Sequence, residues 1–412
     1  MDSAKKSGQE NDEIFDDSNP EEELEEDESD YKIWKKNAPY LYDTLIVTGL
    51  EWPSLCVNWM NKYEEGKLTT QRLVIGTQTN GEENNYLMVI KVKLPINEIE
   101  KQENPSNEEV LNLFKKEKNR IDIESQMVHD GDVNKAKSMP QKGKHNFIAT
   151  FTNKGEIHIF DYFKHQYKEK GNESNPDKIL KGHSDIGYGL CWSQINEGFL
   201  ASGAYDNKVC IFDINSESGG TPIKTWTEHT KCIEDVCFHK VYDYLLGSVG
   251  DDKMCFLYDT RQRDHITKVV GHEAEVNSID FNPTNPFIFL TGSSDKSILL
   301  WDIRNTKYKM HSFIHHEGNV MNVKWNNKKS NIFASLGEDK KILLWDLLQI
   351  GANIARNDNE EAASEMIFEH LGHQNTINDM DWNPFESMMM ASVDGDNTLQ
   401  FWEINSNSIL NK

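Results

Sequence analysis

Short apolar runs separated by turn residues recur along most of the chain. The segment from Gly271 to Ile303 contains three of them, VNSIDF, FIFLTG and SILLWD, which are rich in β-branched and aromatic residues. Asn-Pro dipeptides and a Ser-Asp-Lys turn separate the runs, so the segment predicts three antiparallel strands joined by tight turns. A sheet this small cannot bury its own two faces, and we therefore expect further copies to pack against it.

Five segments of the chain share one spacing of characteristic residues. In each, a histidine is followed by an aromatic residue nine positions later, a hydroxyl at nineteen, an aspartate at twenty-three and an acidic residue at thirty. The histidines are His183, His229, His272, His316 and His373, and the aspartates at twenty-three are Asp206, Asp252, Asp295, Asp339 and Asp396. The intervals between histidines, 46, 43, 44 and 57 residues, indicate the blade period of a WD-repeat propeller.

Two weaker units, residues 54–94 and 126–163, precede these five segments. Together they give seven blades, so the predicted fold class is an all-β, seven-bladed WD-repeat β-propeller. We expect residues 44–48 to supply the outer strand of the last sheet and so to close the ring without free edges. The propeller is assigned to residues 43–405, with insertions at 96–120 and 350–366 and a short tail at 406–412.

Charge is concentrated before the propeller. The 412 residues carry a net charge of −24, and residues 1–30 hold 14 acidic and 2 basic side chains, a net of −12. This composition predicts a disordered acidic tail, which either only solvates the chain or attracts a basic partner. The acidic balance disfavours direct binding to nucleic acid, which needs basic surfaces, and favours basic proteins as partners.

Residues 31–42, YKIWKKNAPYLY, predict an N-terminal α-helix that Pro39 ends or kinks. The helix either only packs against the propeller edge or forms one wall of a groove.

The sequence lacks the signals of several other protein classes. No apolar run reaches the length of a membrane span, and the N-terminus has no signal-peptide core. The six cysteines include no CxxC pair, which indicates reduced thiols in the cytosol or nucleus. None of the common nucleotide or metal motifs is present, so we expect no cofactor and no metal.

Ser, His and Asp recur together, as they do in hydrolase triads. A catalytic triad is built once, beside an oxyanion hole, whereas this set repeats five times together with an aromatic residue. We therefore interpret it as a structural network in which Asp accepts from His, His contacts Ser or Thr, and the hydroxyl contacts the Trp indole. Phe212 and Tyr258 lack the indole, so we expect incomplete networks in the first two clear blades. The predicted protein is not an enzyme.

Residues just after each histidine should line the narrow top mouth of the propeller channel. Polar amides, carboxylates and a tyrosine at this mouth could hold an extended basic peptide, or they could form a merely solvated rim. These positions include Asp132, Asn134, Tyr188, Glu234 and Asn277.

The stretch YKIWKKNAPYLYDTLIVTGLEWPSLCVNW closely resembles the N-terminal region of the retinoblastoma-binding, histone-binding WD-repeat proteins, the family of the small subunit of chromatin assembly factor. The resemblance continues through LVIGTQT, GHSDIGYGLCW, IEDVCFHKVYDYLLGSVGDDK and GHEAEVNSIDFNP, and it covers residues 31–405. It implies a nuclear histone chaperone or scaffold subunit of chromatin assembly, deacetylase, remodelling or Polycomb-type methyltransferase complexes.

The same resemblance implies two histone-binding sites. One is a side groove between the N-terminal helix and the 350–366 insertion, which takes a helix of an arginine-rich core histone. The matching residues are Tyr40, Leu41, Leu45, Asp358, Glu360, Glu361, Ile367 and Phe368. The other is the top mouth, which takes basic tails of a histone or of corepressor partners. Its matching residues are Glu51, Glu82, Asp132, Asn134, Tyr188, Glu234 and Asn277.

Several positions depart from the family pattern. Ala363 and Ser364 replace a Pro-Pro pair, Glu369 replaces an apolar residue, and Ile186, Asn319 and Gly395 stand where acids are usual. Lost carboxylates should weaken the capture of Arg and Lys, which favours the side groove over the top mouth. The alternative function is a propeller substrate adaptor of a ubiquitin ligase, since the fold alone serves both roles.

Overall fold

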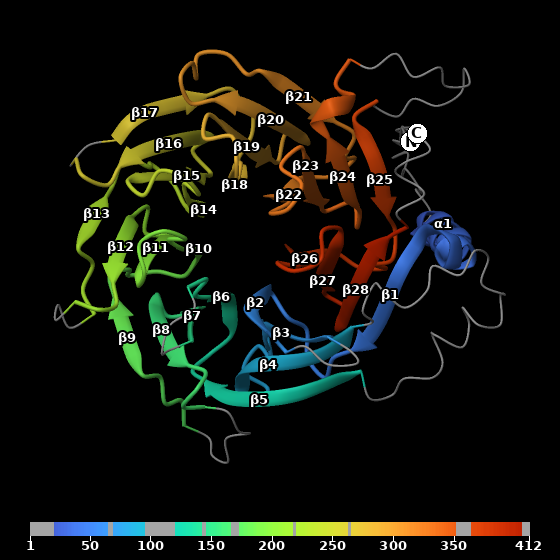
Figure 1. Cartoon of the computed structure of the whole chain (residues 1–412), viewed down its shortest axis with the longest axis horizontal. Coiled ribbons are helices and arrows are strands. Elements are labelled where there is room, and N and C mark those ends of the chain that lie inside the picture. Colours follow the sequence, from blue (N-terminus) through green and yellow to red (C-terminus); the bar gives the residue numbers. More distant parts are fainter. Residues whose placement is uncertain are drawn as a thin grey trace, which may run out of the picture.

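The computed structural model describes residues 20–64, 69–94, 120–141, 146–165, 173–216, 220–262, 265–351 and 364–405. Within them, seven four-stranded antiparallel sheets form a ring around a central channel (Figure 1). This ring is the predicted seven-bladed propeller, and its blades are numbered below in chain order. In blades 1–6 the chain enters at the innermost strand and runs outward strand by strand.

Six blades are formed by four consecutive strands. Blade 1 contains β2 (Val57–Glu64), β3 (Thr69–Gly76), β4 (Asn85–Leu94) and β5 (Ile121–His129). Blade 2 contains β6 (Val133–Ser138), β7 (Phe147–Thr152), β8 (Glu156–Asp161) and β9 (Lys178–Lys181). Blade 3 contains β10 (Gly187–Trp192), β11 (Phe199–Ala204), β12 (Val209–Asp213) and β13 (Lys224–Trp226). Blade 4 contains β14 (Ile233–Phe238), β15 (Leu245–Gly250), β16 (Met254–Asp259) and β17 (His265–Val270). Blade 5 contains β18 (Val276–Phe281), β19 (Ile288–Ser293), β20 (Ser297–Asp302) and β21 (His311–Ile314). Blade 6 contains β22 (Val320–Trp325), β23 (Ile332–Gly337), β24 (Ile342–Asp346) and β25 (Met366–His370), with a short 3-10 helix, η1 (Leu347–Gln349), after β24.

Blade 7 joins the two ends of the chain. It contains β26 (Ile377–Trp382), β27 (Met389–Asp394) and β28 (Thr398–Ile404), and β1 (Tyr42–Gly49) is its outer strand. Strand β1 pairs antiparallel with β28, with Thr44 opposite Glu403 and Gly49 opposite Thr398. Figure 1 shows the blue β1 lying beside the red β28. The prediction that residues 44–48 close the ring is therefore confirmed.

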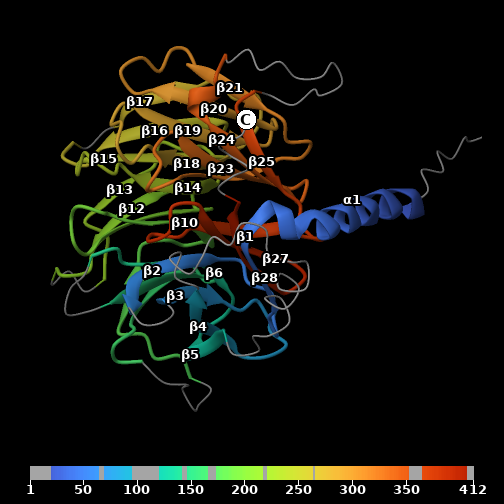
Figure 2. The ribbon, with the colours of Figure 1, turned by 45° about the vertical axis from the view of Figure 1, so that its right-hand side comes forward.

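The N-terminal helix is longer than predicted. Helix α1 (Pro20–Leu41) begins eleven residues before the expected start and projects from the side of the propeller (Figure 2). A proline suits the first position of a helix, where its missing N–H costs no hydrogen bond. Pro39 lies in the last turn, and the helix ends two residues later. The predicted acidic tail therefore overlaps the helix over residues 20–30, and its remainder lies outside the described residues.

One predicted blade boundary was wrong. Residue 126 lies inside β5, which pairs with β4 and belongs to blade 1. The sequence could not show this, because the first two units lack the Gly-His signature that marks the end of an outer strand. The predicted insertions 96–120 and 350–366 lie largely outside the described residues, and the tail 406–412 lies wholly outside them.

The core lies within and between the blades. Strands β15, β19, β23 and β27 are buried along their whole length, because each is the second strand of its sheet and has neighbouring blades on both faces. The largest fully buried side chains include Trp301, Trp325, Trp345 and Trp402. Within the described part of the chain, no helix combines the length and the apolar character needed to cross a membrane.

Candidate functional site

The repeated histidine networks lie inside the blades and hold their strands together. Nδ1 of His272 is 2.9 Å from Oδ2 of Asp295, and Nε2 is 2.7 Å from the hydroxyl of Thr291. The same hydroxyl accepts from Nε1 of Trp301 at 2.8 Å. Blade 6 repeats this arrangement with His316, Asp339, Ser335 and Trp345. Because the hydroxyls and the rings are buried, these networks are structural, as the repetition predicted.

Two details of the predicted networks were wrong. In blade 7, His373 contacts Asp394 at 2.6 Å rather than Asp396. The carboxylate of Asp394 also accepts the backbone N–H of Asp396 at 3.0 Å, so Asp394 organises this turn from two residues upstream. In blade 4, the hydroxyl of Tyr258 is 3.0 Å from Oγ of Ser248, so a tyrosine completes the network in place of an indole.

A buried hydrogen-bond chain fixes α1 to the rim of the propeller. Nε1 of Trp34 donates to the hydroxyl of Tyr42 at 2.9 Å, and this hydroxyl is 2.7 Å from Nδ1 of His370. Burial raises the pKa of Tyr42 far above its ordinary value and lowers the pKa of His370 well below its own. The tyrosine therefore keeps its proton and shares a hydrogen bond with a neutral imidazole. These three residues, from α1, β1 and β25, are called the helix latch below.

The predicted groove residues lie beside the helix latch. Leu41, Leu45 and Ile367 pack against the apolar cluster that contains Trp34, Tyr42 and Phe368. The ring of Phe368 is edge-on to that of Tyr42, with centroids 5.4 Å apart. Tyr40 is 65 % exposed at the end of α1. The acidic residues Asp358, Glu360 and Glu361 lie outside the described residues.

The sequence analysis did not predict that the three residues of the helix latch belong to this site. Tyr42 and His370 are 328 positions apart, and no local pattern indicates that their side chains meet. Ile33, which is 58 % exposed on α1, was also missed as a surface residue. Glu369, which departs from the family pattern, forms an ion pair with Lys341 at 3.1 Å.

An acidic and aromatic cluster occupies one arc of the top mouth. Glu234, at the start of β14, is hydrogen-bonded to Tyr205 and Asp251. Burial, and next to it the charge of Asp251, raises the pKa of Glu234 to about 7. The rings of Tyr188 and Tyr205 lie 5.8 Å apart, and burial together with Glu234 and Asp132 raises the pKa of Tyr188. These five residues are called the mouth cluster below.

Tyr205 and Asp251 were not predicted as members of this cluster. Asp251 directly precedes Asp252, one of the aspartates that recur at position twenty-three of the repeat. The second aspartate of the pair does hold a turn, since Asp252 contacts His229 at 3.0 Å. Asp251, the first aspartate of the pair, instead contacts Glu234. The signal in the sequence was therefore a pair of adjacent aspartates at a turn that needs only one of them.

The remaining predicted mouth residues differ in exposure. Glu51 and Glu82 are exposed. Asn277 is held in place because its amide donates to the carbonyl of Val320 at 2.9 Å. Asn134 is only 4 % exposed, and its amide nitrogen has no acceptor among the described residues.

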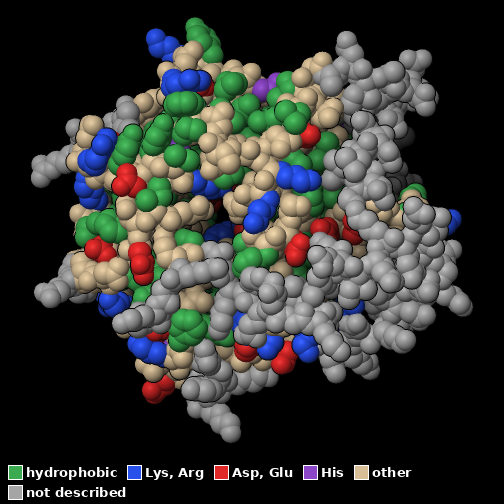
Figure 3. Space-filling model, in the orientation of Figure 1, with side chains coloured by type: hydrophobic (Ala, Val, Ile, Leu, Met, Phe, Trp, Pro, Cys, Tyr) green, Lys and Arg blue, Asp and Glu red, His purple; other side chains and the backbone are tan. Residues whose placement is uncertain are grey.

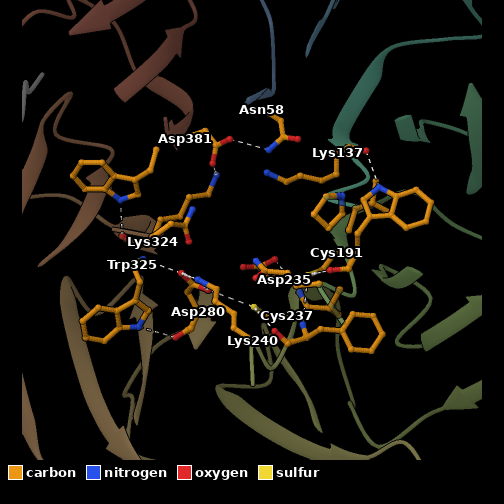
Figure 4. Close-up of a pocket in the computed structure, with 18 of the residues that line it drawn as sticks. Asn58, Lys137, Cys191, Asp235, Cys237, Lys240, Asp280, Lys324, Trp325 and Asp381 are labelled. Atoms are coloured by element: carbon orange, nitrogen blue, oxygen red, sulfur yellow. Dashed lines mark hydrogen bonds and ion pairs between the residues drawn. The ribbon is translucent and has the colours of Figure 1, made fainter. Parts of the chain in front are cut away.

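The carboxylates deeper in the channel are already engaged in holding the blades together. The fully buried Asp379 of β26 is 3.3 Å from Nζ of Lys135 and accepts the N–H of Val57 in the next blade at 3.2 Å. Asp280 of β18 likewise accepts the N–H of Trp325 at 2.8 Å and pairs with Lys240 (Figure 4). Among the described residues, no group of three or more His, Cys, Asp or Glu side chains is placed to hold a metal ion.

Seven sheets, histidine networks and blade closure by the N-terminal strand together define a WD-repeat β-propeller. A WD-domain, G-beta repeat model matches residues 174–213, 220–259, 263–302, 307–346 and 364–403. A second model, which describes the histone-binding protein RBBP4 or a subunit of the CAF1 complex, matches residues 29–96, which include the end of α1 and strands β1 to β4. The chain belongs to this RBBP4-type family of WD-repeat histone-binding proteins. It is accordingly a histone-binding chromatin-factor subunit, from families of binding scaffolds rather than enzymes.

Proposed function

We propose that the chain binds a helix of an arginine-rich core histone in the side groove between α1 and β25. The observation that carries this proposal is the helix latch, which holds α1 against the rim at the point where the predicted groove residues meet. A helix fixed by three buried polar groups provides a rigid wall for a partner, so little ordering is required on binding.

The outer surface of α1 offers apolar side chains to such a partner. Ile33 is 58 % and Tyr40 is 65 % exposed, and the two are seven positions apart, which places them on the same side of the helix. A partner that covers these side chains would remove apolar area from water, and this burial stabilises the complex by about 25 cal/mol per Å². Leu41, Leu45 and Ile367 continue this apolar surface toward the propeller, and Phe368 forms its floor.

Charge supports a basic partner. The chain carries a net charge of −24. We assign Asp358, Glu360 and Glu361 the role of receiving arginines of the histone helix, because carboxylates bind guanidinium groups through paired hydrogen bonds.

The top mouth is proposed as a second site, for basic tails. Its mouth cluster holds three carboxylates and two tyrosines on one arc, where an arginine or lysine would find charge partners and aromatic faces. Glu51, Glu82, Asn134 and Asn277 complete the proposed site around the rim. An acidic mouth disfavours the alternative of a ubiquitin-ligase adaptor with a basic top surface.

The proposed setting is the nucleus. We infer a histone chaperone or scaffold subunit shared by chromatin assembly, deacetylase, remodelling or Polycomb-type methyltransferase complexes. The match to a model that describes a component of the CAF1 complex supports the first of these.

The test combines Leu41→Ala with Glu361→Lys and measures binding to the folded pair of arginine-rich core histones. We expect a loss of about 3 kcal/mol, or roughly 100-fold in Kd, because one change removes an apolar contact and the other reverses a charge. Ile314→Ala is the matched control, since Ile314 is 68 % exposed on β21 of another blade. Measuring the binding of histones that lack their tails distinguishes the side groove from the top mouth, because such histones can occupy only the side groove. Binding that survives the double change would show that the groove is misplaced.

A further inference from the structure

The centre of the ring contains a cavity of about 220 Å³ that the proposed function does not use. Figure 3 shows it as a hollow at the middle of this face, with Lys and Arg side chains gathered around it. Two cysteines line it, Cys191 of β10 and Cys237 of β14, on the innermost strands of blades 3 and 4 (Figure 4). Both cysteines therefore belong to the wall of this cavity.

The two thiols lie close together. Their interaction lowers the pKa of Cys191 and raises the pKa of Cys237. Sγ of Cys191 also accepts the backbone N–H of Phe238 at 3.4 Å, and Sγ of Cys237 is 3.5 Å from Oδ1 of Asp280. The N–H stabilises negative charge on Cys191, while the carboxylate keeps the proton on Cys237. Each thiol also donates to the carbonyl of the next residue, Cys191 to Trp192 at 3.5 Å and Cys237 to Phe238 at 3.4 Å. Because Cys191 accepts an N–H whereas Cys237 faces a carboxylate, Cys191 is the better nucleophile of the pair and Cys237 is the resolving partner.

The other cysteines have different surroundings. Cys232 contacts the carbonyl of Tyr205, with Sγ and O 4.0 Å apart, and Cys210 contacts the hydroxyl of Thr225. Cys56 and Cys255 are buried, and burial raises the pKa of each. All six cysteines are free thiols in the structure.

We propose that Cys191 and Cys237 form a redox modification site, in which a hydroperoxide converts the thiol pair into a disulfide between blades 3 and 4. The Cys191 thiolate attacks one peroxide oxygen, the S–O bond forms as the O–O bond breaks, and the released hydroxide takes up a proton to become water. The sulfur of Cys237 then attacks the sulfenic acid, the S–S bond forms as the S–O bond breaks, and the second water leaves with the Cys237 proton. Two thiols lose two electrons and hydrogen peroxide gains them.

Such a bond would link the innermost strands of two adjacent blades below the top mouth. Strand β10 also carries Tyr188, and β14 carries Glu234, each three residues before its cysteine. The disulfide would fix the spacing of two mouth-cluster residues at the other end of the same strands. This consequence rests on the proposed function of the mouth, whereas the formation of the bond does not.

The experiment treats the full chain with hydrogen peroxide, blocks free thiols and maps peptides by mass spectrometry without reduction. We expect a Cys191–Cys237 cross-linked peptide that disappears on reduction and in Cys237→Ser. That variant should instead retain a sulfenic acid that a dimedone probe labels at Cys191. Cys232→Ser is the matched control and should cross-link like the natural chain.

A second readout is thermal unfolding. A cross-link that closes a loop of this length should raise the melting temperature by a few degrees, roughly 2–5 °C, in the natural chain but not in Cys237→Ser. Peroxide treatment that leaves Cys191 and Cys237 unlinked in a folded protein would overturn the proposal. Equal labelling of Cys191 and Cys232, with no cross-link, would do the same.

Discussion

Glu234 should make tail binding at the top mouth depend on pH. Burial and the neighbouring Asp251 raise its pKa to about 7, so the carboxyl is largely protonated at pH 6 and largely ionised at pH 8. Only the ionised form attracts a lysine or arginine strongly. The ionised fraction rises from about one tenth to about nine tenths between these pH values, so the affinity for a basic tail should rise about tenfold, or about 1.4 kcal/mol.

The assay is fluorescence anisotropy with a labelled basic histone-tail peptide at pH 6, 7 and 8 and constant ionic strength. Glu234→Gln keeps the shape of the side chain but cannot ionise, so its binding should be weak and nearly flat across the same range. A histone helix bound in the side groove serves as an internal control, because Glu234 does not lie there. A natural chain with a flat profile, or with tighter binding at pH 6, would refute the reasoning.

The same residue should influence stability with the opposite sign. A carboxyl whose pKa rises on folding from 4.5 to about 7 contributes stability below pH 4.5, and this contribution is lost as the pH rises through 7. Glu234→Gln should therefore increase the free energy of unfolding at pH 8, by at most about 3 kcal/mol, and change it little at pH 4.5. Urea unfolding at the two pH values measures this directly. If Glu234→Gln binds the basic tail less tightly but has a higher free energy of unfolding, Glu234 serves binding at a cost in stability.

Two further predictions concern the frame that supports the groove. Tyr42→Phe should destabilise the protein by about 2 kcal/mol and expose α1 to proteolysis, because Trp34 and His370 lose their buried partner. Unchanged urea midpoints and cleavage rates would show that the helix latch does not hold the helix. The second prediction concerns Glu403 of β28, which lies opposite Thr44 of β1. Glu403→Gln should stabilise the protein at pH 8 but not at pH 4.5, because burial raises the pKa of Glu403 to about 7. Asp302→Asn, at the equivalent position of blade 5, should not stabilise at pH 8, since its hydrogen bond with Arg304 lowers the pKa of that carboxyl.

The propeller could be predicted because its information is local and repeated. Each His, hydroxyl and aromatic residue that forms a network lies within about 30 positions of its partners, and five copies in phase removed the ambiguity of any single strand. The predicted networks were wrong at positions where another residue makes the same hydrogen bond. Asp394 replaced Asp396 and the hydroxyl of Tyr258 replaced an indole, and neither exchange alters the spacing that the sequence reveals.

The helix latch could not be predicted for the opposite reason. Its members belong to α1, β1 and β25, and they meet only because the first strand of the chain completes the last blade. Ring closure thus brings together the described residues of the proposed side groove. The family resemblance named residues on both sides of this groove, but the polar contacts that make its wall rigid follow from the closed ring.

The mouth cluster changes the interpretation of the missing acids. Asn319 and Gly395 lie on blades 6 and 7, whereas Asp132, Glu234 and Asp251 lie on blades 2 and 4, so two of the three departures fall outside the arc that keeps its charge. Within that arc, burial and then repulsion by Asp251 raise the pKa of Glu234, whereas burial and then the charge of Glu275 raise the pKa of Asp251. A bound arginine would relieve this repulsion as well as form new hydrogen bonds. Fewer acids at the rim therefore need not mean a weak site, because the remaining ones are held in a partly buried arrangement that a cation stabilises.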